Sequence, residues 1–471
     1  MLFNSIEYLF FFIIVLSLSW ITIGIPKLRL WILLLASYYF YASNNYWLIV
    51  IFIFTTQFDY VCAIKLEDST NEKVRKIFLL ISLISNLSIL CFFKYFNFFA
   101  SSVFDVLSFI GYKASWVDIN ITLPVGISFY TFQSLSYVVD VYRREIKAVR
   151  QWPKFTFFVA YFPHMIAGPI IRPHYFLPQL EKTQKLTVAG LEFALTYIGR
   201  GLVKKIIFGD FLANYADKLY NNPADADFIT TWIGILAFTF QIYFDFSGYS
   251  DIAIGSAKLM GFDIPENFKR PYIAKTITDF WRRWHISLSS WLRDYLYIPL
   301  GGNRVDKKYK IYKNLMITML LGGLWHGASW HFILWGGLQG GMLSVEKLTG
   351  IDKLNFKLLS VKKILFIIFT FFFINLSWIV FRSHSMRDTI CILSNSFRFK
   401  NTHTLFSYGE CFAILISLIG LSSQYIDEYT DFYESYLKWP VWRKALVYSM
   451  VCVGVILFAS SDVRPFIYFQ F

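Results

Sequence analysis

The chain has 471 residues, of which 56% are hydrophobic, 20% are aromatic and only 16% are charged. Soluble globular domains usually carry about 25% charged residues, so this composition and a mean hydropathy of +0.48 exclude an ordinary water-soluble protein. A net charge of +14 would suggest nucleic acid as a partner of a soluble protein, but here apolar windows separate the basic clusters. We therefore expect no nucleic-acid partner, and we assign the basic residues to cytoplasmic loops of a protein embedded in the lipid bilayer.

Apolar windows recur along the whole chain. A helix needs about 20 apolar residues to cross the hydrocarbon core, and some windows are shorter, which predicts tilted or re-entrant helices. The sequence thus predicts an all-α polytopic membrane protein with roughly 10 to 13 membrane helices. We expect one domain over residues 1–471, with its core at 121–345. The candidate spans are 2–25, 30–43, 46–64, 77–100, 121–141, 155–171, 190–213, 231–257, 314–345 (long enough for two), 361–381, 405–424 and 441–460.

The first window has no basic flank and no small-residue cleavage site, so it is predicted to be a first transmembrane helix rather than a cleaved signal peptide. The five cysteines are scattered without a CxxC pattern, and we expect them to be small buried hydrophobes. They are Cys62, Cys91, Cys391, Cys411 and Cys452.

The loops predict the orientation of the chain. Segments 65–76 and 142–154 are basic, and 258–313 holds twelve Lys and Arg against five Asp and Glu. The positive-inside rule places these three segments in the cytoplasm. Segment 216–228, ADKLYNNPADADF, has little positive charge and is predicted to face outside.

Residues 280–304 read FWRRWHISLSSWLRDYLYIPLGGNR. Treated as one helix, they form an aromatic stripe with basic residues beside it, which suits the cytoplasmic membrane surface. The tryptophans could instead be an interfacial belt, the arginines topology anchors and His285 a buried structural histidine. The stripe comprises Trp281, Trp284, His285, Leu288, Trp291, Leu292, Tyr295 and Leu296, and the residues away from it are Arg282, Arg283, Ser290 and Asp294.

Residues 320–337, LLGGLWHGASWHFILWGG, place two histidines in an apolar segment. His326 lies 13 residues beyond Lys313, a rise of about 20 Å on a helix, which carries it well into the membrane. Ionisable groups at that depth tend to face a cavity or a polar partner. On one regular helix His326 and His331 would point about 140° apart, so we expect no metal site. Neighbouring glycines favour His326 as the functional histidine and leave His331 a structural role.

Segment 241–255, QIYFDFSGYSDIAIG, places four polar residues at the expected end of an apolar span. They could cap a helix terminus or line a substrate cavity, and the sequence favours neither. These residues are Asp245, Ser247, Tyr249 and Asp251.

Together these strings resemble the membrane-bound O-acyltransferase family, and within it the branch that acetylates alginate and other bacterial polysaccharides. The resemblance covers most of the chain. It rests on LPVGISFYTFQSLSYVVDVYRRE (123–145), YFPHMIAGPIIRP (161–173), QIYFDFSGYSDIAIGSAKLMGFDIPENFKRPY (241–272), the 280–304 segment and GGLWHGASWHFILWG (322–336).

The resemblance implies a ring of tilted helices, with short re-entrant or interfacial helices, around a central tunnel. It places the family's invariant histidine at His326 and its second histidine at His285. It also implies a bacterial plasma-membrane enzyme that passes acetyl groups from cytoplasmic acetyl-CoA outward to a cell-envelope glycan. Acetyl-CoA would be a donor substrate and not a bound cofactor. We expect the acceptor enzyme, a partner acetyltransferase outside the membrane, to be a separate chain, because only a short tail follows residue 460.

The chemistry expected is acyl transfer from a thioester to a hydroxyl. His326 would be the general base or would carry the acetyl group, and His285 would orient the donor or stabilise the oxyanion. Three alternatives stay open: D-alanyl transfer from a carrier protein, which LYIPLGGNR after the histidine motif disfavours, a transporter without chemistry, and a scaffold. The candidate donor-binding residues are Trp281, Arg282, Arg283, Trp284, Asp245, Ser247, Tyr249, Asn303, Arg304 and Trp325.

Overall fold

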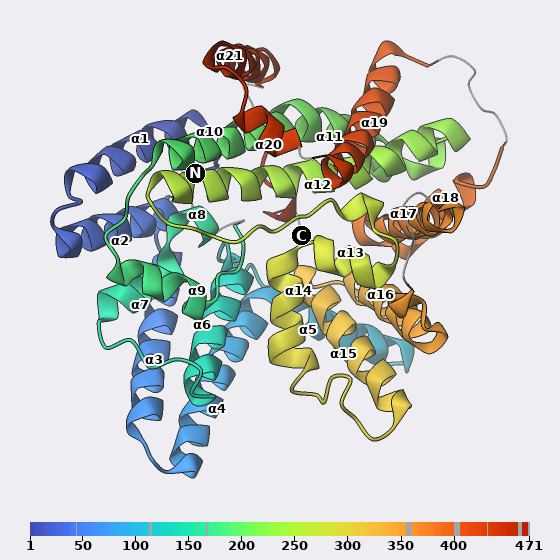
Figure 1. The fold of residues 1–471 in the computed structure, drawn as a ribbon. Coiled ribbons are helices and arrows are strands. Elements are labelled where there is room, and N and C mark those ends of the chain that lie inside the picture. Colours follow the sequence, from blue (N-terminus) through green and yellow to red (C-terminus); the bar gives the residue numbers. More distant parts are fainter. Residues whose placement is uncertain are drawn as a thin grey trace. The chain divides into compact units, whose positions relative to one another are not determined.

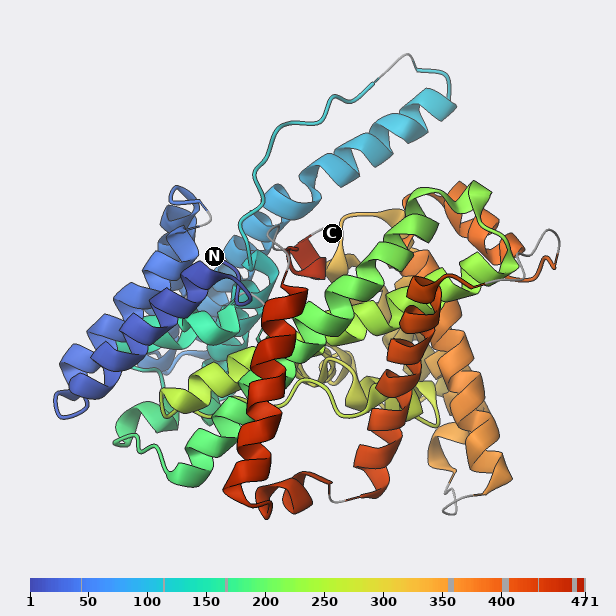
Figure 2. The ribbon, with the colours of Figure 1, turned by 90° about the horizontal axis from the view of Figure 1, so that it is seen from above.

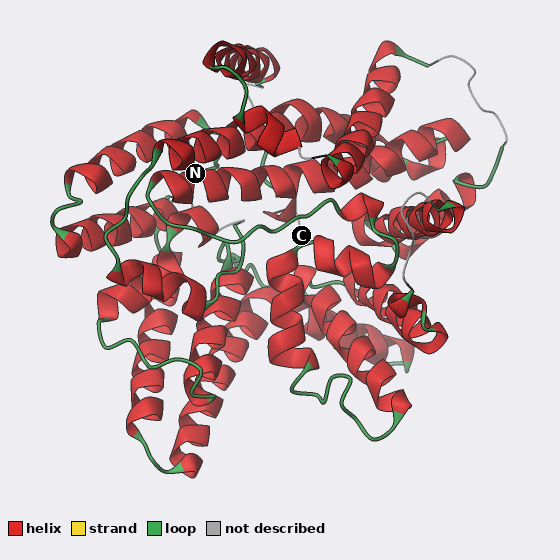
Figure 3. Ribbon diagram, in the orientation of Figure 1, coloured by secondary structure: helices red, strands yellow, loops and turns green. Residues whose placement is uncertain are grey.

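The computed structural model contains only helices and loops in the part of the chain that it describes (Figure 3). The described residues are 1–43, 45–112, 115–165, 168–354, 360–399, 406–430, 432–459 and 464–469. They form two compact units, one of residues 1–195 with 253–265 and the other of residues 196–252 with 266–471. The expectation of one domain over the whole chain stays a prediction, as do the ring of helices and the tunnel.

The first unit is built on helical hairpins, of which α3 and α4 form the longest (Figure 1). The helix that begins with α4 continues through one π-helical turn into α5. The helices of this unit are α1 (Ile6–Ile21), α2 (Pro26–Ala42), α3 (Leu48–Asp68), α4 (Glu72–Leu90), η1 (Cys91–Tyr95), α5 (Phe96–Phe109), α6 (Ile127–Tyr142), α7 (Trp152–Ala160), α8 (Phe162–Met165), α9 (Pro173–Phe176) and η2 (Leu177–Glu181). The helix α10 (Val188–Leu202) begins in this unit and ends in the second.

The two basic loops of the first unit lie against each other. Arg144 pairs with Glu72 at 2.6 Å, and Arg150 pairs with Asp68 at 2.6 Å. All four residues belong to the segments 65–76 and 142–154 or their edges, which the sequence places together in the cytoplasm. Their contact agrees with one common side of the membrane for both loops.

The second unit contains the longest helix, α12, and the tightest hairpin, α15 with α16. Its elements after α10 are η3 (Val203–Gly209), α11 (Asp210–Asn221), η4 (Pro223–Asp225), α12 (Phe228–Leu259, of which the last turns belong to the first unit), η5 (Pro271–Ile273), α13 (Ile277–Arg283), α14 (Ile286–Leu292), η6 (Arg293–Tyr297), α15 (Lys308–His326), α16 (Trp330–Thr349), η7 (Ile351–Lys353), α17 (Val361–Arg382), α18 (Met386–Asn395), α19 (Tyr408–Tyr429), α20 (Phe432–Leu437), α21 (Val441–Phe458) and η8 (Ile467–Phe469).

Glycines allow α15 and α16 to pack backbone against backbone. A Cβ placed on Gly323 would lie 2.1 Å from the carbonyl oxygen of Phe332 and 3.2 Å from the Cα of Gly336. The glycine that precedes His326 by one turn therefore allows the following helix of the same chain to approach closely.

Two C-terminal spans, α19 and α21, run in opposite directions and are joined through the short helix α20 (Figure 2). Helix α21 has no buried residue, and beyond the basic pair Arg443 and Lys444 in its first turn most of its side chains are apolar, as expected for a surface that faces lipid.

The all-α polytopic fold is confirmed. Six described helices are long and apolar enough to cross a membrane, fewer than the 10 to 13 expected. The difference arises because several windows fold as short helices: 155–171 holds α7 and α8, and 190–213 is broken by the π-helical segment η3. Residues 166–167, 405 and 460 of the predicted spans lie outside the described residues.

Three expectations are wrong. Segment 280–304 is not one helix, because the backbone turns left-handed at His285 (φ 43°) between α13 and α14. The polar residues of 241–255 lie in the interior of α12, not at a helix end. Cys91, Cys411 and Cys452 are exposed, since a lipid-facing surface accommodates small apolar side chains as well as a core does.

Candidate active site

His326 is the last residue of α15, about 27 Å along the helix from its start at Lys308. Its side chain is buried, and four aromatic rings surround the imidazole. The centroid distances are 5.1 Å to Trp325, 5.2 Å to Trp335, 5.4 Å to Phe381 and 5.5 Å to Tyr468. These rings leave the His326 side chain 4% exposed.

His331 has a different environment. Helix α15 ends at His326 and α16 begins at Trp330, so the two histidines belong to two helices and the 140° estimate does not apply. The Ser329 hydroxyl caps α16 by accepting the His331 N–H, and it lies 3.1 Å from Nδ1 of the His331 ring. The structure thus gives His331 a local role at the start of α16.

His285 is fully buried at the start of α14, where Asn267 holds it. The Asn267 Oδ1 atom accepts the Ser287 N–H at 3.2 Å and the Ser287 hydroxyl at 2.9 Å, and it lies 3.2 Å from His285 Nδ1. The Asn267 carbonyl oxygen also accepts the Ile286 N–H at 2.9 Å. Asn267 therefore fixes the strained turn that carries His285.

This hydrogen bonding selects one tautomer of His285. The Ser287 N–H can only donate, so the Asn267 atom that it meets is the carbonyl oxygen, and His285 Nδ1 must carry the proton that this oxygen accepts. In the neutral ring Nε2 then has the lone pair. His285 lies outside the six candidate spans, and burial lowers the pKa of its imidazole from 6.5 to about 3. Its neutral form, a proton acceptor at Nε2, is the one present near neutral pH.

Shared aromatic neighbours bring the two histidines into one site. The Trp325 ring lies 5.9 Å from His285 and 5.1 Å from His326. On a second side, Phe246 packs on His285 at 4.6 Å and on Tyr468 at 4.7 Å, and Tyr468 contacts His326. The structure thus brings together His285, His326 and Trp325, three of the site residues predicted from the sequence.

The sequence did not indicate Asn267, Phe246 or Tyr468. Asn267 lies in segment 241–272, in a polar stretch whose local pattern does not single it out. Tyr468 belongs to the C-terminal tail, where the crowded aromatic sequence RPFIYFQF was the one available signal.

A cavity of about 370 Å³ lies between α13, α14, α15 and α16. Trp281, Arg282 and Asn303, three of the predicted donor-binding residues, line it together with Arg293 and Lys347. The Trp281 ring lies 5.7 Å from Trp335, which in turn contacts His326. We call this space the α13–α16 cavity. Trp281 and Trp335 lie between it and His326. Two of its three cations are already paired, Arg293 with Asp294 at 2.7 Å and Lys347 with Asp352 at 2.6 Å.

Three other predicted donor-binding residues lie away from this cavity. Arg283 bridges Asp279 at 2.8 Å and Glu428 at 3.1 Å. Trp284 is buried against Trp378 and Phe280, and Arg304 is exposed and does not line the cavity. Arg283 and Trp284 therefore hold α13 in place.

Asp245 and Tyr249 contact the C-terminal tail, and the tail carries Tyr468. Asp245 pairs with Lys205 at 2.6 Å and accepts the Ile467 N–H at 2.6 Å, and Tyr249 packs on Phe466 at 4.8 Å. Ser247 is buried on the same helix. These contacts seat residues 464–469, and with them Tyr468, beside His326.

The sequence of the chain was compared with known proteins. The profile of the membrane-bound O-acyltransferase family matches residues 33–381, a stretch that contains both histidines. The chain belongs to this family. It is an O-acyltransferase, a multi-pass membrane protein whose family-defining region includes the histidine site and the α13–α16 cavity.

Relatives refine the placement within the O-acyltransferases. The chain is 43% identical to a probable alginate O-acetylase AlgI of Pseudomonas syringae pv. tomato, over 82% of this chain and 73% of the relative. It is 36% identical to a probable alginate O-acetylase AlgI of Pseudomonas putida over the full length of both. A peptidoglycan O-acetyltransferase of Helicobacter pylori is 32% identical over 88% of this chain and 86% of the relative.

Proposed function

We propose that this O-acyltransferase takes acetyl groups from cytoplasmic acetyl-CoA and passes them across the bacterial plasma membrane for O-acetylation of a cell-envelope or secreted polysaccharide. The observation that carries the proposal is the pairing of His285 and His326 around Trp325, next to a cavity lined by cations. Relatives named for acetylating alginate and peptidoglycan support a glycan as the class of acceptor.

The acceptor hydroxyl is a weak nucleophile until a base takes its proton. In the proposed step the hydroxyl oxygen attacks the thioester carbonyl carbon while a histidine takes the hydroxyl proton. The C–S bond then breaks, the thiolate receives the proton, and the products are the acetyl ester and free CoA. His326, enclosed by rings, is the proposed base or carrier of the acetyl group.

The tautomer of His285 changes its proposed role. A neutral ring with the proton on Nδ1, directed at Asn267, has no proton on Nε2 to donate to an oxyanion. Of the two roles expected from the sequence, orienting the acyl donor or stabilising the oxyanion, this tautomer disfavours the second, and His285 fits a second proton acceptor or an orienting residue.

The α13–α16 cavity is the proposed donor site. Arg282, Arg293 and Lys347 would hold coenzyme phosphates, since charged donors favour phosphate oxygens, and the Trp281 side would receive the acetyl-bearing arm. The acceptor glycan would be reached on the outer face, through a separate partner acetyltransferase.

The test replaces His326 by Ala in cells that make the acetylated polymer, at matched protein level, and measures ester-linked acetate on the glycan. The proposal predicts loss of acetylation in His326→Ala and full acetylation in His331→Ala, the matched control from the same segment. Unchanged acetylation in His326→Ala would support a scaffold. If the wild-type polymer carried D-alanine esters and no acetate, that result would favour D-alanyl transfer from a carrier protein.

A further inference from the structure

A second cavity of about 510 Å³ lies within the second unit, between α10, α12, α19, α20 and α21. We call it the α19–α21 cavity. It shares no lining residue with the α13–α16 cavity and contains neither histidine. Acyl transfer as proposed above leaves this space without a function.

One end of the cavity is polar and cationic. Arg200, Lys204 and Arg270 line it with a single carboxylate, Asp427, which is half exposed. Behind the wall, Asp251 accepts from Arg200 at 2.6 Å and from Lys204 at 2.7 Å, so one carboxylate is shared by two cations. Glu428, which lies 3.0 Å from Arg270, brings these six groups to a balance of zero, but neither Glu428 nor Asp251 lines the cavity. The lining itself presents three cations and one carboxylate, which favours an anionic ligand.

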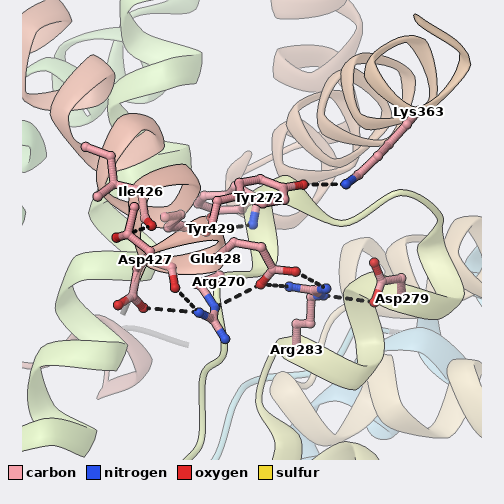
Figure 4. Close-up of polar contacts among 11 residues, drawn as sticks. Arg270, Tyr272, Asp279, Arg283, Lys363, Ile426, Asp427, Glu428 and Tyr429 are labelled. Atoms are coloured by element: carbon pink, nitrogen blue, oxygen red, sulfur yellow. Dashed lines mark hydrogen bonds and ion pairs between the residues drawn. The ribbon is translucent and has the colours of Figure 1, made fainter. Parts of the chain in front are cut away.

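The backbone of Arg270, at this end of the cavity, is strained. Its backbone is left-handed (φ 51°), a conformation that costs a residue with a side chain free energy and is found where the surrounding structure imposes it. Figure 4 shows its guanidinium directed at the end of α19, where it contacts the Asp427 carbonyl oxygen and lies 3.0 Å from Glu428. Glu428 is also bound by Arg283 (Figure 4), so it neutralises Arg270 only in part.

A buried amide belongs to the same lining. Gln424 is 2% exposed, and its Oε1 accepts the Tyr272 N–H at 2.9 Å. Its Nε2 is buried and has no hydrogen-bond partner among the described residues. A buried amide N–H without a partner is costly, so a small movement of this side chain toward an acceptor in the cavity would be favourable.

The other end of the cavity is apolar and lies between two membrane spans. Ile426 of α19 and Val447 and Val451 of α21 line it together with Phe432 and Trp439. Residues 438–444, which end the connection between these spans and form the first turn of α21, read KWPVWRK, and tryptophans with basic residues at span ends mark the membrane interface. The apolar end is therefore placed to receive an acyl chain from the bilayer.

We propose that the α19–α21 cavity is a binding site for an anionic phospholipid, with the phosphate at Arg200, Lys204, Arg270 and Gln424 and an acyl chain between α19 and α21. The two ends of one cavity match the two ends of such a lipid in polarity and charge. This site is distinct from the donor site and does not depend on the identity of the acyl group.

The experiment uses the full chain, purified in detergent and delipidated. Binding of dioctanoyl-phosphatidylglycerol is measured by its displacement of a fluorescent analogue, with dioctanoyl-phosphatidylcholine, inorganic phosphate and coenzyme A as competitors. The variants are Arg270→Ala at the polar end, Val447→Trp at the apolar end and Arg443→Ala as the control. Arg443 is an exposed cation in the first turn of α21 that does not line the cavity.

We expect saturable binding of phosphatidylglycerol that weakens about ten-fold or more in Arg270→Ala and Val447→Trp and is unchanged in Arg443→Ala. Val447→Trp alters no charge, so it tests the cavity even if Arg270→Ala fails to fold. Equal competition by phosphatidylcholine would overturn the anionic headgroup, and displacement by inorganic phosphate alone would overturn the lipid. Displacement by coenzyme A would make the cavity a second donor site, and equal weakening by Arg443→Ala would reduce it to general basic attraction.

Discussion

Gly323→Ala tests whether the α15–α16 hairpin sets the position of His326. The added Cβ would lie 2.1 Å from the Phe332 carbonyl oxygen, whereas ordinary contact begins at 3.4 Å. The two helices must therefore separate by about 1.3 Å, the difference of these distances, only one turn before His326. Overpacking of this kind costs typically about 1–3 kcal/mol, and a shift of about 1 Å at a catalytic group can reduce the rate about 100-fold.

The assay compares Gly323→Ala with Gly341→Ala in glycan acetylation at matched protein level and in the thermal unfolding midpoint of the purified chain. Gly341 lies on α16, where a Cβ would meet nothing within 4 Å, so its replacement removes only the poor helix propensity of glycine. We expect Gly323→Ala to lose activity and stability, and Gly341→Ala to keep both. Equal, near-normal activity in the two variants would refute the positioning of His326 by this hairpin.

Three further variants test His285, the C-terminal tail and the proposed donor site. Burial lowers the pKa of His285 in the folded protein from 6.5 to about 3. Below about pH 6.5 the unfolded chain therefore binds a proton at His285 that the folded protein does not bind. The free energy of unfolding then falls by up to about 1.4 kcal/mol for each pH unit. His285→Gln should therefore unfold with a shallower pH dependence than the wild type between about pH 7.5 and about pH 5.5, and parallel curves would contradict the assigned shift. Ile467→Pro removes the N–H group that Asp245 accepts and should reduce acetylation, whereas Ile467→Val keeps this N–H group and should keep acetylation. Equal activity of the two variants would show that the tail does not position the site. Arg282→Ala should raise the KM for acetyl-CoA about ten-fold with little change in kcat, and a KM equal to that of the wild type would remove Arg282 from the donor site.

Sequence reasoning located the histidines because depth and helical rise depend only on chain position. The sequence measured the depth of His326 from Lys313, whereas α15 begins at Lys308 within the basic stretch, and His326 is its last residue. The membrane class was equally accessible, since it rests on composition and on the length of apolar windows.

Elements that depend on tertiary contacts were missed. The break at His285 has no glycine or proline to announce it, and it exists because Asn267 binds the backbone and side chain of the following turn. Likewise, the local sequence around Arg283 cannot show whether this side chain binds a ligand or forms an ion pair with Glu428. The reason is that Glu428 lies 145 positions away in the chain. Helical periodicity cannot report such distant partners.

The most direct test of the central proposal is turnover by the purified full chain supplied with labelled acetyl-CoA and a glycan acceptor, with its partner acetyltransferase if one is required. We predict release of free CoA and labelling of the acceptor by the wild type, and neither by His326→Ala when the variant retains the wild-type unfolding midpoint. Turnover by His326→Ala at the wild-type rate would contradict a catalytic role for His326, and transport of solute without CoA release by the wild type would contradict acyl transfer from acetyl-CoA.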